Sequence, residues 1–285
     1  MIELTALNLF ILLSFGVFIG VLGSALGVGG GVFMVPFLVL VLKVPIHQAV
    51  AASLVAIVAT SSAVGAVNIE RGLANIRLGI TLEVTAAVGS IAGAIIASRL
   101  PAHAMQIMFA VMLFPVSALM FLKGRRGRHR AASTAVPAQA GSPARTSSFD
   151  SAFFDPALAS HTPYSVKNMV PASFISFFSG SLSGLLGIGG GIVHVPVMNL
   201  LCGVPMKAAA ATSNFVIGVS AAASAMVYLR KGLIPPGLTA VMVVGVLGGS
   251  FLGIHILYKA KSEKLQLVFS GLTLFVAVKM LMSVS

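Results

Sequence analysis

The chain has 285 residues, of which 58% are hydrophobic and 8% are charged, and its mean hydropathy is +1.05. A soluble domain could not cover its surface with so few charges, so this composition excludes a soluble globular protein and predicts a polytopic membrane protein. The net charge of +12 does not indicate nucleic-acid binding, because the lysines and arginines cluster at the ends of apolar runs, where they serve as topology signals and headgroup anchors.

The sequence also lacks the motifs of several functional classes. The single cysteine, Cys202, lies in an apolar segment, so we expect no disulfide framework and no cysteine-based metal site. There is no Walker motif, metalloprotease motif or nucleophile elbow, so we expect neither an enzyme nor a bound cofactor. The N-terminal apolar run carries Glu3 and exceeds signal-peptide length, so it is expected to remain as a membrane element.

The hydropathy pattern of each half of the chain predicts one long, broken apolar segment followed by three ordinary membrane spans. In the first half these segments are 7–42, 48–67, 78–98 and 105–122. In the second half they are 170–201, 208–229, 238–257 and 265–282. The chain is therefore expected to consist of a first membrane repeat at 1–122, a linker at 123–167 and a second membrane repeat at 168–285. The fold class that we predict is all-α.

A glycine motif occurs once in each half, at an offset of 160 residues. The sequence LGVGGG at Leu26 to Gly31, followed by Val35 and Pro36, returns as LGIGGG at Leu186 to Gly191, followed by Val195 and Pro196. The same offset matches further pairs: Ser53 with Ser213, Gly72 with Gly232, Gly89 with Gly249, and Gly93 with Gly253. This repetition is typical of a transporter built from two repeats with broken helices.

The motif lies in a segment whose length does not fit a simple span. A helix crosses a bilayer in about 20 residues, so 7–42 is too long for one upright span and too short for two. Each of three adjacent glycines costs a helix up to about 1 kcal/mol relative to alanine, and a proline follows. We therefore predict two part-length helices that meet near mid-membrane. Unwound backbone at that depth must face protein or a water-filled cavity, so a site is expected there.

The glycines are the first candidate binding residues. Helices that begin after the motifs would direct backbone N–H groups and a positive dipole end toward an anion. The alternative is close packing of small residues, which explains Gly89 and Gly93 well but explains three adjacent glycines poorly. We assign substrate binding to Gly29, Gly30, Gly31, Gly189, Gly190 and Gly191.

Polar side chains at the start of the next span are the second set of candidates. Hydroxyl and amide groups there could donate hydrogen bonds to an oxyanion in a desolvated pocket. The alternative, hydrogen bonding between helices or to the helix's own carbonyls, is left open. The candidates are Ser53, Thr212, Ser213 and Asn214.

Two ionisable residues inside the spans are candidates for coupling to a proton. Glu83 has no acidic counterpart in the second half, where Val243 stands, and the alternative is an interfacial pair with Arg77. His194 follows Gly191 by three residues and aligns with Met34. A histidine there can titrate or donate to an anion, and the alternative is a packed neutral side chain. No metal site is assigned to either residue.

The linker at 123–167 begins with five basic residues and continues as a Ser/Ala/Pro-rich stretch. A basic cluster directly after a span predicts a cytoplasmic location. If each glycine segment re-enters the membrane, the repeats are inverted; if each segment spans, they are parallel. Lys259, Lys261 and Lys264 become cytoplasmic only in the inverted arrangement, whereas Arg230 and Lys231 do so only in the parallel one. We favour the inverted arrangement.

The duplicated motif resembles that of a known family. Two copies of L-G-[VI]-G-G-G-x-x-x-V-P, each followed by a V-P and an alanine-rich stretch, resemble the TauE/SafE sulfite exporter family, also called the sulfonate uptake permease family. The second copy, which ends in Ala-Thr-Ser-Asn at 211–214, looks especially similar. The first copy departs at 51–54, where the threonine and asparagine are missing, so the two halves are not expected to contribute equally.

The resemblance implies a multi-pass protein of the inner or plasma membrane that moves small sulfur-containing anions such as sulfite, sulfoacetate or related sulfonates. We therefore expect an ion-coupled secondary transporter with alternating access, whose partners are the anionic substrate, the lipid bilayer and a coupled proton or other ion. Two alternatives remain: an anion channel, and a membrane scaffold or sensor that acts through the basic linker.

Overall fold

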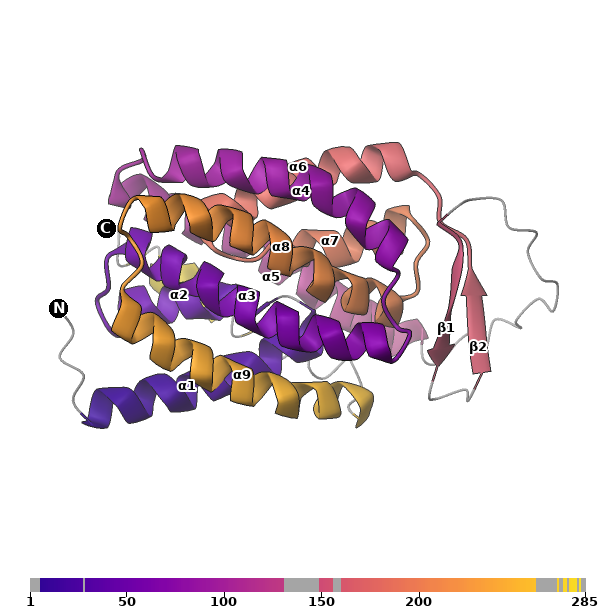
Figure 1. Ribbon diagram of the computed structural model, residues 1–285, viewed down its shortest axis with the longest axis horizontal. Coiled ribbons are helices and arrows are strands. Elements are labelled where there is room, and N and C mark those ends of the chain that lie inside the picture. Colours follow the sequence, from indigo (N-terminus) through magenta and orange to yellow (C-terminus); the bar gives the residue numbers. More distant parts are fainter. Residues whose placement is uncertain are drawn as a thin grey trace.

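The computed structural model describes residues 6–27, 29–130, 149–155 and 160–259, together with 271, 274, 275, 277–280 and 282. Most of this part of the chain is helical, and the long helices lie roughly along one common axis, with a small β-hairpin at one end of the bundle (Figure 1). The predicted all-α membrane class is confirmed in outline. Five of the described helices are long and apolar enough to cross a membrane.

The elements follow one another in a regular order. The first half contains α1 (Ala6–Leu26), α2 (Gly31–Leu40), α3 (Ile46–Glu70), α4 (Ile76–Ala97) and α5 (Ala102–Arg130). The hairpin consists of β1 (Ser151–Asp155) and β2 (Ser160–Tyr164). The second half contains α6 (Met169–Leu186), α7 (Gly191–Pro196), the π-helix η1 (Val197–Leu201), α8 (Met206–Arg230) and α9 (Pro236–Lys259).

Both long apolar segments are broken at the glycine motif, as the sequence predicts. Helix α1 ends at Leu26, the first residue of the first motif, and α2 begins at Gly31, its last residue. Helices α6 and α7 are divided in the same way, at Leu186 and Gly191. In the first half, the segment folds back on itself, because Phe37 of α2 stacks on Phe15 of α1 with ring centroids 3.5 Å apart. In the second half, the Asn168 side chain donates to the Leu201 carbonyl at 3.0 Å, which joins the start of α6 to the end of η1.

Glycines set the packing of the outer helix pairs. Gly249 lies against Val17 of α1, and Gly253 against Val21, so closely that a Cβ at either glycine would overlap the partner backbone. Gly89 and Gly93 of α4 pack in the same manner on Phe177 and Ser181 of α6. The small-residue packing that the Gly-xxx-Gly spacing indicates is therefore present. Residue numbers rise together in both pairs, so α1 is parallel to α9 and α4 is parallel to α6.

The central pair, α3 and α8, runs in opposite directions. Gly218 of α8 lies against Ser61 of α3, whereas Phe215 lies against Gly65. Residue numbers along α8 therefore fall as those along α3 rise, so the two helices are antiparallel. Each of these two helices has 25 residues, and they occupy equivalent positions 160 residues apart.

One end of the bundle is closed by the segment around the hairpin. Asn75 caps α4 by accepting from the Leu78 amide at 3.1 Å, and its side-chain amide donates to the Phe149 carbonyl at 2.9 Å and to the Tyr164 hydroxyl at 3.1 Å. Burial raises the pKa of Tyr164. This network attaches the end of the predicted linker to the α3–α4 turn.

One predicted boundary differs from the structure. Helix α5 continues through the basic cluster to Arg130, eight residues past the predicted end of its span at 122, because arginine and lysine are good helix formers. The linker residues 131–148 and 156–159, and most of the span predicted at 265–282, lie outside the described residues.

Candidate functional site

The glycine breaks owe their shape to left-handed backbone. Gly27, Gly29 and Gly30 have φ values of 69°, 77° and 78°, and Gly187, Gly189 and Gly190 have values of 68°, 86° and 65°. Residues with a Cβ are strained in this region, so the turn between the part-length helices requires glycine. The residues are also buried. The fourth glycine of each motif, Gly31 or Gly191, is the first residue of the returning helix.

The two breaks meet inside the protein. A Cβ on Gly31 would overlap the carbonyl oxygen of Gly187, so residues from the two motifs are in direct backbone contact. Each break also rests on the central helix of the other half: the Cβ position of Gly27 lies 3.1 Å from Ala210, and that of Gly187 lies 3.1 Å from Val50. The predicted glycines of both halves therefore converge on one place.

Two serines fasten this arrangement. The Ser53 hydroxyl donates to the Gly187 carbonyl at 2.8 Å, and the Ser213 hydroxyl donates to the Gly27 carbonyl at 3.2 Å. Both serines are fully buried. Each half thus holds the break of the other half. The alternative role that the sequence left open, a hydrogen bond within the protein, is therefore present for both serines. Because each hydroxyl proton is used in this bond, the hydroxyl oxygen could only accept a hydrogen bond from a ligand.

The backbone amides of the two returning helices differ. The Gly191 amide donates to the Gly189 carbonyl at 2.8 Å, so this amide is already engaged within its own motif. In α2, the first amides that bind back to Gly30 are those of Phe33 and Met34, at 3.1 and 3.3 Å. Helix α2, with 10 residues, directs the positive end of its dipole at the meeting point of the breaks.

Thr212 and Asn214 take different roles although they are close in sequence. The Thr212 hydroxyl accepts a hydrogen bond from the backbone amide of Asn75 at 2.9 Å, so the structure places Thr212 in the α4 capping network. The backbone carbonyl of Asn214 accepts a hydrogen bond from the Ser61 hydroxyl. The side-chain nitrogen of Asn214 has no partner among the described residues, and the residue is 3% exposed. A buried donor without an acceptor is rare, so this side-chain amide is a candidate donor to a bound ligand.

Glu83 is a second buried polar group, and among the described residues its carboxylate interacts only with the Ser220 backbone, outside hydrogen-bond geometry. Both carboxylate oxygens lack a hydrogen bond within the described part of the chain, and the residue is 6% exposed. The side chain therefore does not form the hydrogen-bonded interfacial pair with Arg77 that the sequence allows. Glu83 lies one turn beyond Gly79, whose face packs on Thr212 and Phe215 of α8.

His194 is held on the first turn of α7. Its Nδ1 lies 3.0 Å from both the Gly190 carbonyl and the Ser179 hydroxyl, and Ser179 in turn donates to Gly190 at 2.9 Å. A proton on Nδ1 satisfies the carbonyl, which leaves Nε2 as an acceptor. Nε2 is buried and has no partner among the described residues. His194 is thus attached directly to the second break.

Three buried polar groups escaped the sequence analysis. Asn68 on α3 and the serines Ser176 and Ser183 on α6 each carry a side-chain atom that has no hydrogen-bond partner within the described residues. The available signal for Asn68 was an amide near the end of an apolar span. The serines gave no such signal, since hydroxyls in membrane helices usually bond to their own helix.

Comparison with known proteins identifies the family. The family model described as Sulfite exporter TauE/SafE matches residues 12–280. The probable membrane transporter protein YunE of Bacillus subtilis (strain 168) is 28% identical over 265 residues, which cover 90% of this chain and 92% of that protein. The probable membrane transporter protein YdhB of the same organism is 24% identical over 236 residues, which cover 82% and 84%.

A plant relative matches over a shorter region. Sulfite exporter TauE/SafE family protein 5 of Arabidopsis thaliana is 35% identical over 89 residues, which cover 31% of this chain and 20% of that protein. No solved structure matches the chain. The family match over nearly the whole length, together with membrane-spanning helices broken at paired glycine motifs, establishes that this chain is a membrane transporter of the TauE/SafE sulfite exporter family.

Proposed function

We propose that this protein is an ion-coupled secondary transporter of small sulfur-containing oxyanions, such as sulfite, sulfoacetate or related sulfonates, in the cell membrane. The observation that carries the proposal is the convergence of the two glycine breaks, each hydrogen-bonded to a serine of the other half. Broken helices that meet inside a bundle of membrane spans are the usual place for a transported solute. The family description supplies the sulfite class.

The proposal includes two homologous repeats of inverted topology. Three findings support it: the element bounds recur at an offset of 160 residues, each glycine segment folds back on itself, and the equivalent helices α3 and α8 are antiparallel. Helices that are equivalent by sequence and opposite in direction imply a pseudo-two-fold axis in the membrane plane. Parallel repeats would place α3 and α8 in the same direction.

The distribution of charge suggests that the hairpin end of the bundle is cytoplasmic. Basic residues at that end occupy the α3–α4 turn, the end of α5 and the starts of α6 and α8: Arg71, Arg77, Lys123, Arg125, Arg126, Arg128, Arg130, Lys167 and Lys207. The helix ends on the opposite side carry Lys43, Arg99, Arg230 and Lys231. The excess of basic residues supports a cytoplasmic linker at 123–167.

In the proposed site, the anion lies beside the glycine breaks. The unpartnered amide of Asn214 and the N-terminal end of α2, formed by Gly29 to Gly31, supply donors. Gly191, Ser53 and Ser213 contribute chiefly by fixing the shape of the breaks, because their donors are already used within the protein. Gly189 and Gly190 contribute the left-handed backbone of the second break. Thr212 acts at a distance, through the α4 cap.

Coupling is assigned to Glu83, with His194 as the second candidate. An ionised carboxylate without a partner is costly to bury, so a change of charge on Glu83 would favour a rearrangement that brings it to water or to a counter-ion. His194 would act differently. Its free Nε2 can accept a proton beside the second break, where the added charge would attract an anion.

The transport step that we propose is a rocking of one repeat against the other. The glycine residues at the centre are buried in this conformation, so access requires movement of the re-entrant hairpins relative to α3 and α8. The Ser53–Gly187 and Ser213–Gly27 bonds cross the boundary that would move. Their exchange offers a structural basis for alternating access.

Uptake by proteoliposomes tests the proposal. Liposomes that contain the purified protein would receive radiolabelled sulfite, sulfoacetate or acetate, with and without a pH gradient. Saturable sulfite or sulfoacetate uptake that responds to the gradient supports the coupled carrier. Gradient-independent, non-saturating flux would instead identify an anion channel, and the absence of flux for every anion would contradict a transport role.

A further inference from the structure

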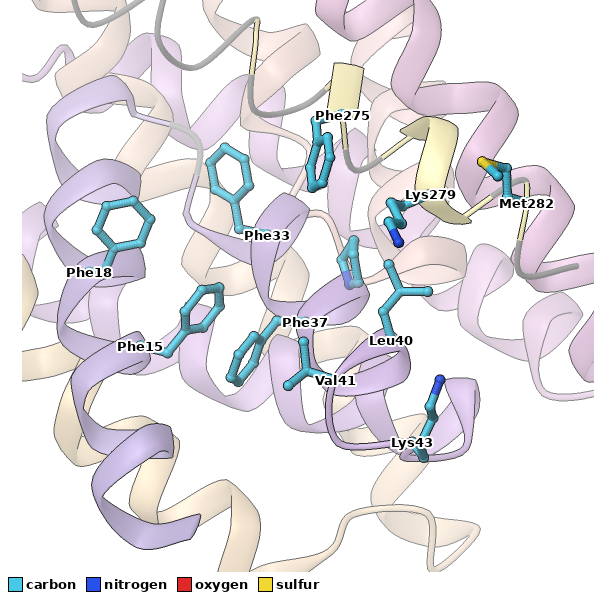
Figure 2. A pocket seen from close by; sticks show the side chains of 11 residues that line it. Phe15, Phe18, Phe33, Phe37, Leu40, Val41, Lys43, Phe275, Lys279 and Met282 are labelled. Atoms are coloured by element: carbon cyan, nitrogen blue, oxygen red, sulfur yellow. The ribbon is translucent and has the colours of Figure 1, made fainter. Parts of the chain in front are cut away.

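A pocket of about 620 Å³ lies on the outer side of the first re-entrant hairpin and is lined by residues of α1, α2 and the C-terminal segment. It is lined mostly by phenylalanines of α1 and α2 and by residues of the C-terminal segment (Figure 2). Proteins bind small ligands in cavities of roughly 300–1,000 Å³, so the pocket is large enough for a ligand. Neither the family match nor the transport proposal gives it a role.

The chemistry of the pocket is that of an amphipathic anion site. Its walls are apolar and aromatic, whereas its two polar lining residues are both lysines, Lys43 and Lys279. Figure 2 shows that the two ammonium groups are directed toward the same space beside Leu40. Among the described residues that line the pocket, none is acidic. Two like charges that face one space favour an anion between them.

The backbone at Lys43 gives independent support. Lys43 has φ 54°, a left-handed conformation that residues other than glycine rarely adopt. Its counterpart 160 residues later is Gly203, with φ 75°. Equivalent backbone hydrogen bonds of 2.9 Å close both turns. The Val44 amide donates to the Leu38 carbonyl, and the Val204 amide donates to the Met198 carbonyl. A lysine therefore stands where the backbone favours glycine, which points to a requirement for its charge.

The other pocket walls also differ between the halves. Phe33 and Phe37 of α2 correspond to Val193 and Val197, and Phe15 corresponds to Ile175. The second re-entrant hairpin thus keeps an aromatic residue only at Phe178, the counterpart of Phe18, and it lacks the lysine. Since the two hairpins share their backbone plan, the pocket is a specialised feature of the first one.

We propose that this pocket binds an anionic phospholipid of the surrounding bilayer, with its headgroup at Lys43 and Lys279 and an acyl chain between the phenylalanines. The rim residues Phe275 and Phe18 are 63% and 45% exposed on the outward face of the bundle, so the pocket opens toward the bilayer. Lys43 lies in the turn between α2 and α3, at the level of the helix ends, where headgroups are found.

The deep end of the site reaches the transport machinery. Phe33 is 3% exposed and belongs to the first turn of α2, directly after the glycine break. Phe37 stacks on Phe15 and so joins the two arms of the hairpin. A lipid chain bound here would fill the space beside the first re-entrant hairpin, which α1 and α2 form on either side of the first glycine break.

A tryptophan reporter tests the lipid site, because the chain contains no tryptophan. Phe37→Trp places one in the pocket, and Phe251→Trp places a control on α9, where Phe251 is 54% exposed. Each variant would be reconstituted with dibrominated phosphatidylglycerol or dibrominated phosphatidylcholine, whose bromines quench tryptophan on contact. At equal mole fraction, we expect the anionic lipid to quench the Phe37→Trp variant more strongly than phosphatidylcholine does. The two lipids should quench the Phe251→Trp control equally.

Charge variants complete the test. In the Phe37→Trp background, Lys43→Gly restores the glycine that the second half carries and should reduce the preference for the anionic lipid by about fivefold. Lys279→Gln should act similarly, whereas Arg99→Gln, at the same end of the bundle but outside the pocket, should have no effect. Three results would overturn the proposal. The first is equal quenching of the Phe37→Trp reporter by both lipids, and the second is a preference for the anionic lipid that survives the loss of both lysines. The third is displacement of the lipid by soluble octanesulfonate.

Discussion

Ser53 donates a hydrogen bond to the carbonyl of Gly187 across the boundary between the two halves, and its counterpart Ser213 does the same for Gly27. The unwound turns expose carbonyl groups that a regular helix would satisfy, and the serines satisfy them from the other half. The two breaks are consequently held by reciprocal contacts, so that neither half completes the centre alone.

Removal of these hydroxyls should weaken the centre. Ser53→Ala or Ser213→Ala leaves a buried carbonyl without its donor, and we expect a loss of about 1 kcal/mol in unfolding free energy for each. Slower sulfite uptake should accompany the loss, because the breaks are less well aligned. Thermal denaturation in detergent and initial uptake rates measure the two effects.

The control is Thr81→Ala, whose exposed hydroxyl bonds only to the Arg77 carbonyl of its own helix. This variant should match the wild type in both assays. If Ser53→Ala and Ser213→Ala also behave like the wild type, the reciprocal bonds do not hold the breaks.

The inverted arrangement predicts that equivalent turns lie on opposite sides of the membrane. Gly72 and Gly232 close α3 and α8 with φ values of 65° and 66°, and a Cβ at either position would meet open space. Gly72→Cys and Gly232→Cys, each in a Cys202→Ala background, should react with a membrane-impermeant maleimide from opposite faces. Gly72→Cys should react only from the cytoplasmic face. Reaction of both cysteines from one face would indicate parallel repeats.

Glu83→Gln separates coupling from binding. The amide removes the titratable charge from a buried position while it keeps the shape of the side chain. We expect exchange of labelled for unlabelled sulfite to continue and accumulation driven by a pH gradient to be lost.

His194→Met introduces the residue that the first half carries at Met34 and serves as the comparison. If His194 is the coupling group, the outcomes for the two variants will be reversed. Gradient-driven accumulation that survives in both variants would exclude both residues as coupling groups.

The role of the linker can be examined through Asn75. Asn75→Ala removes the α4 cap and the bonds to Phe149 and Tyr164, and it should cost about 1 kcal/mol in stability and make the hairpin segment more sensitive to protease. Sulfite uptake measured at a temperature well below the melting point should be unchanged if the linker is a tether. Loss of uptake by a folded Asn75→Ala protein would favour a regulatory linker.

The spans and the breaks could be predicted from local sequence because their causes are local. Apolar length determines a membrane helix, and three adjacent glycines prevent one, so the predicted segments and the positions of the turns agree with α1 to α4 and α6 to α9. The Gly-xxx-Gly packing of α4 and α9 is also visible in the spacing alone.

The roles of individual polar residues depend on contacts that the sequence does not contain. Ser53 and Gly187 are 134 residues apart, and only the packing of α3 against the second break shows that the serine hydroxyl is engaged. The same holds for Thr212, which joins the α4 cap, and for Asn214, whose side-chain amide has no partner among the described residues. Adjacent residues on one helix face different neighbours, so their types alone did not distinguish them.

Sulfite uptake by Asn214→Leu proteoliposomes tests the central claim, that the anion binds beside the converging breaks. Leucine removes the unpartnered buried donor without breaking any hydrogen bond of the described residues, so the protein should melt at or above the wild-type temperature. Gly248→Ala, at a helical position where a Cβ would meet open space, is the control. The account predicts wild-type uptake for Gly248→Ala and a loss of at least about tenfold for Asn214→Leu, which corresponds to one charge-assisted hydrogen bond. Wild-type uptake by a folded Asn214→Leu protein would contradict it.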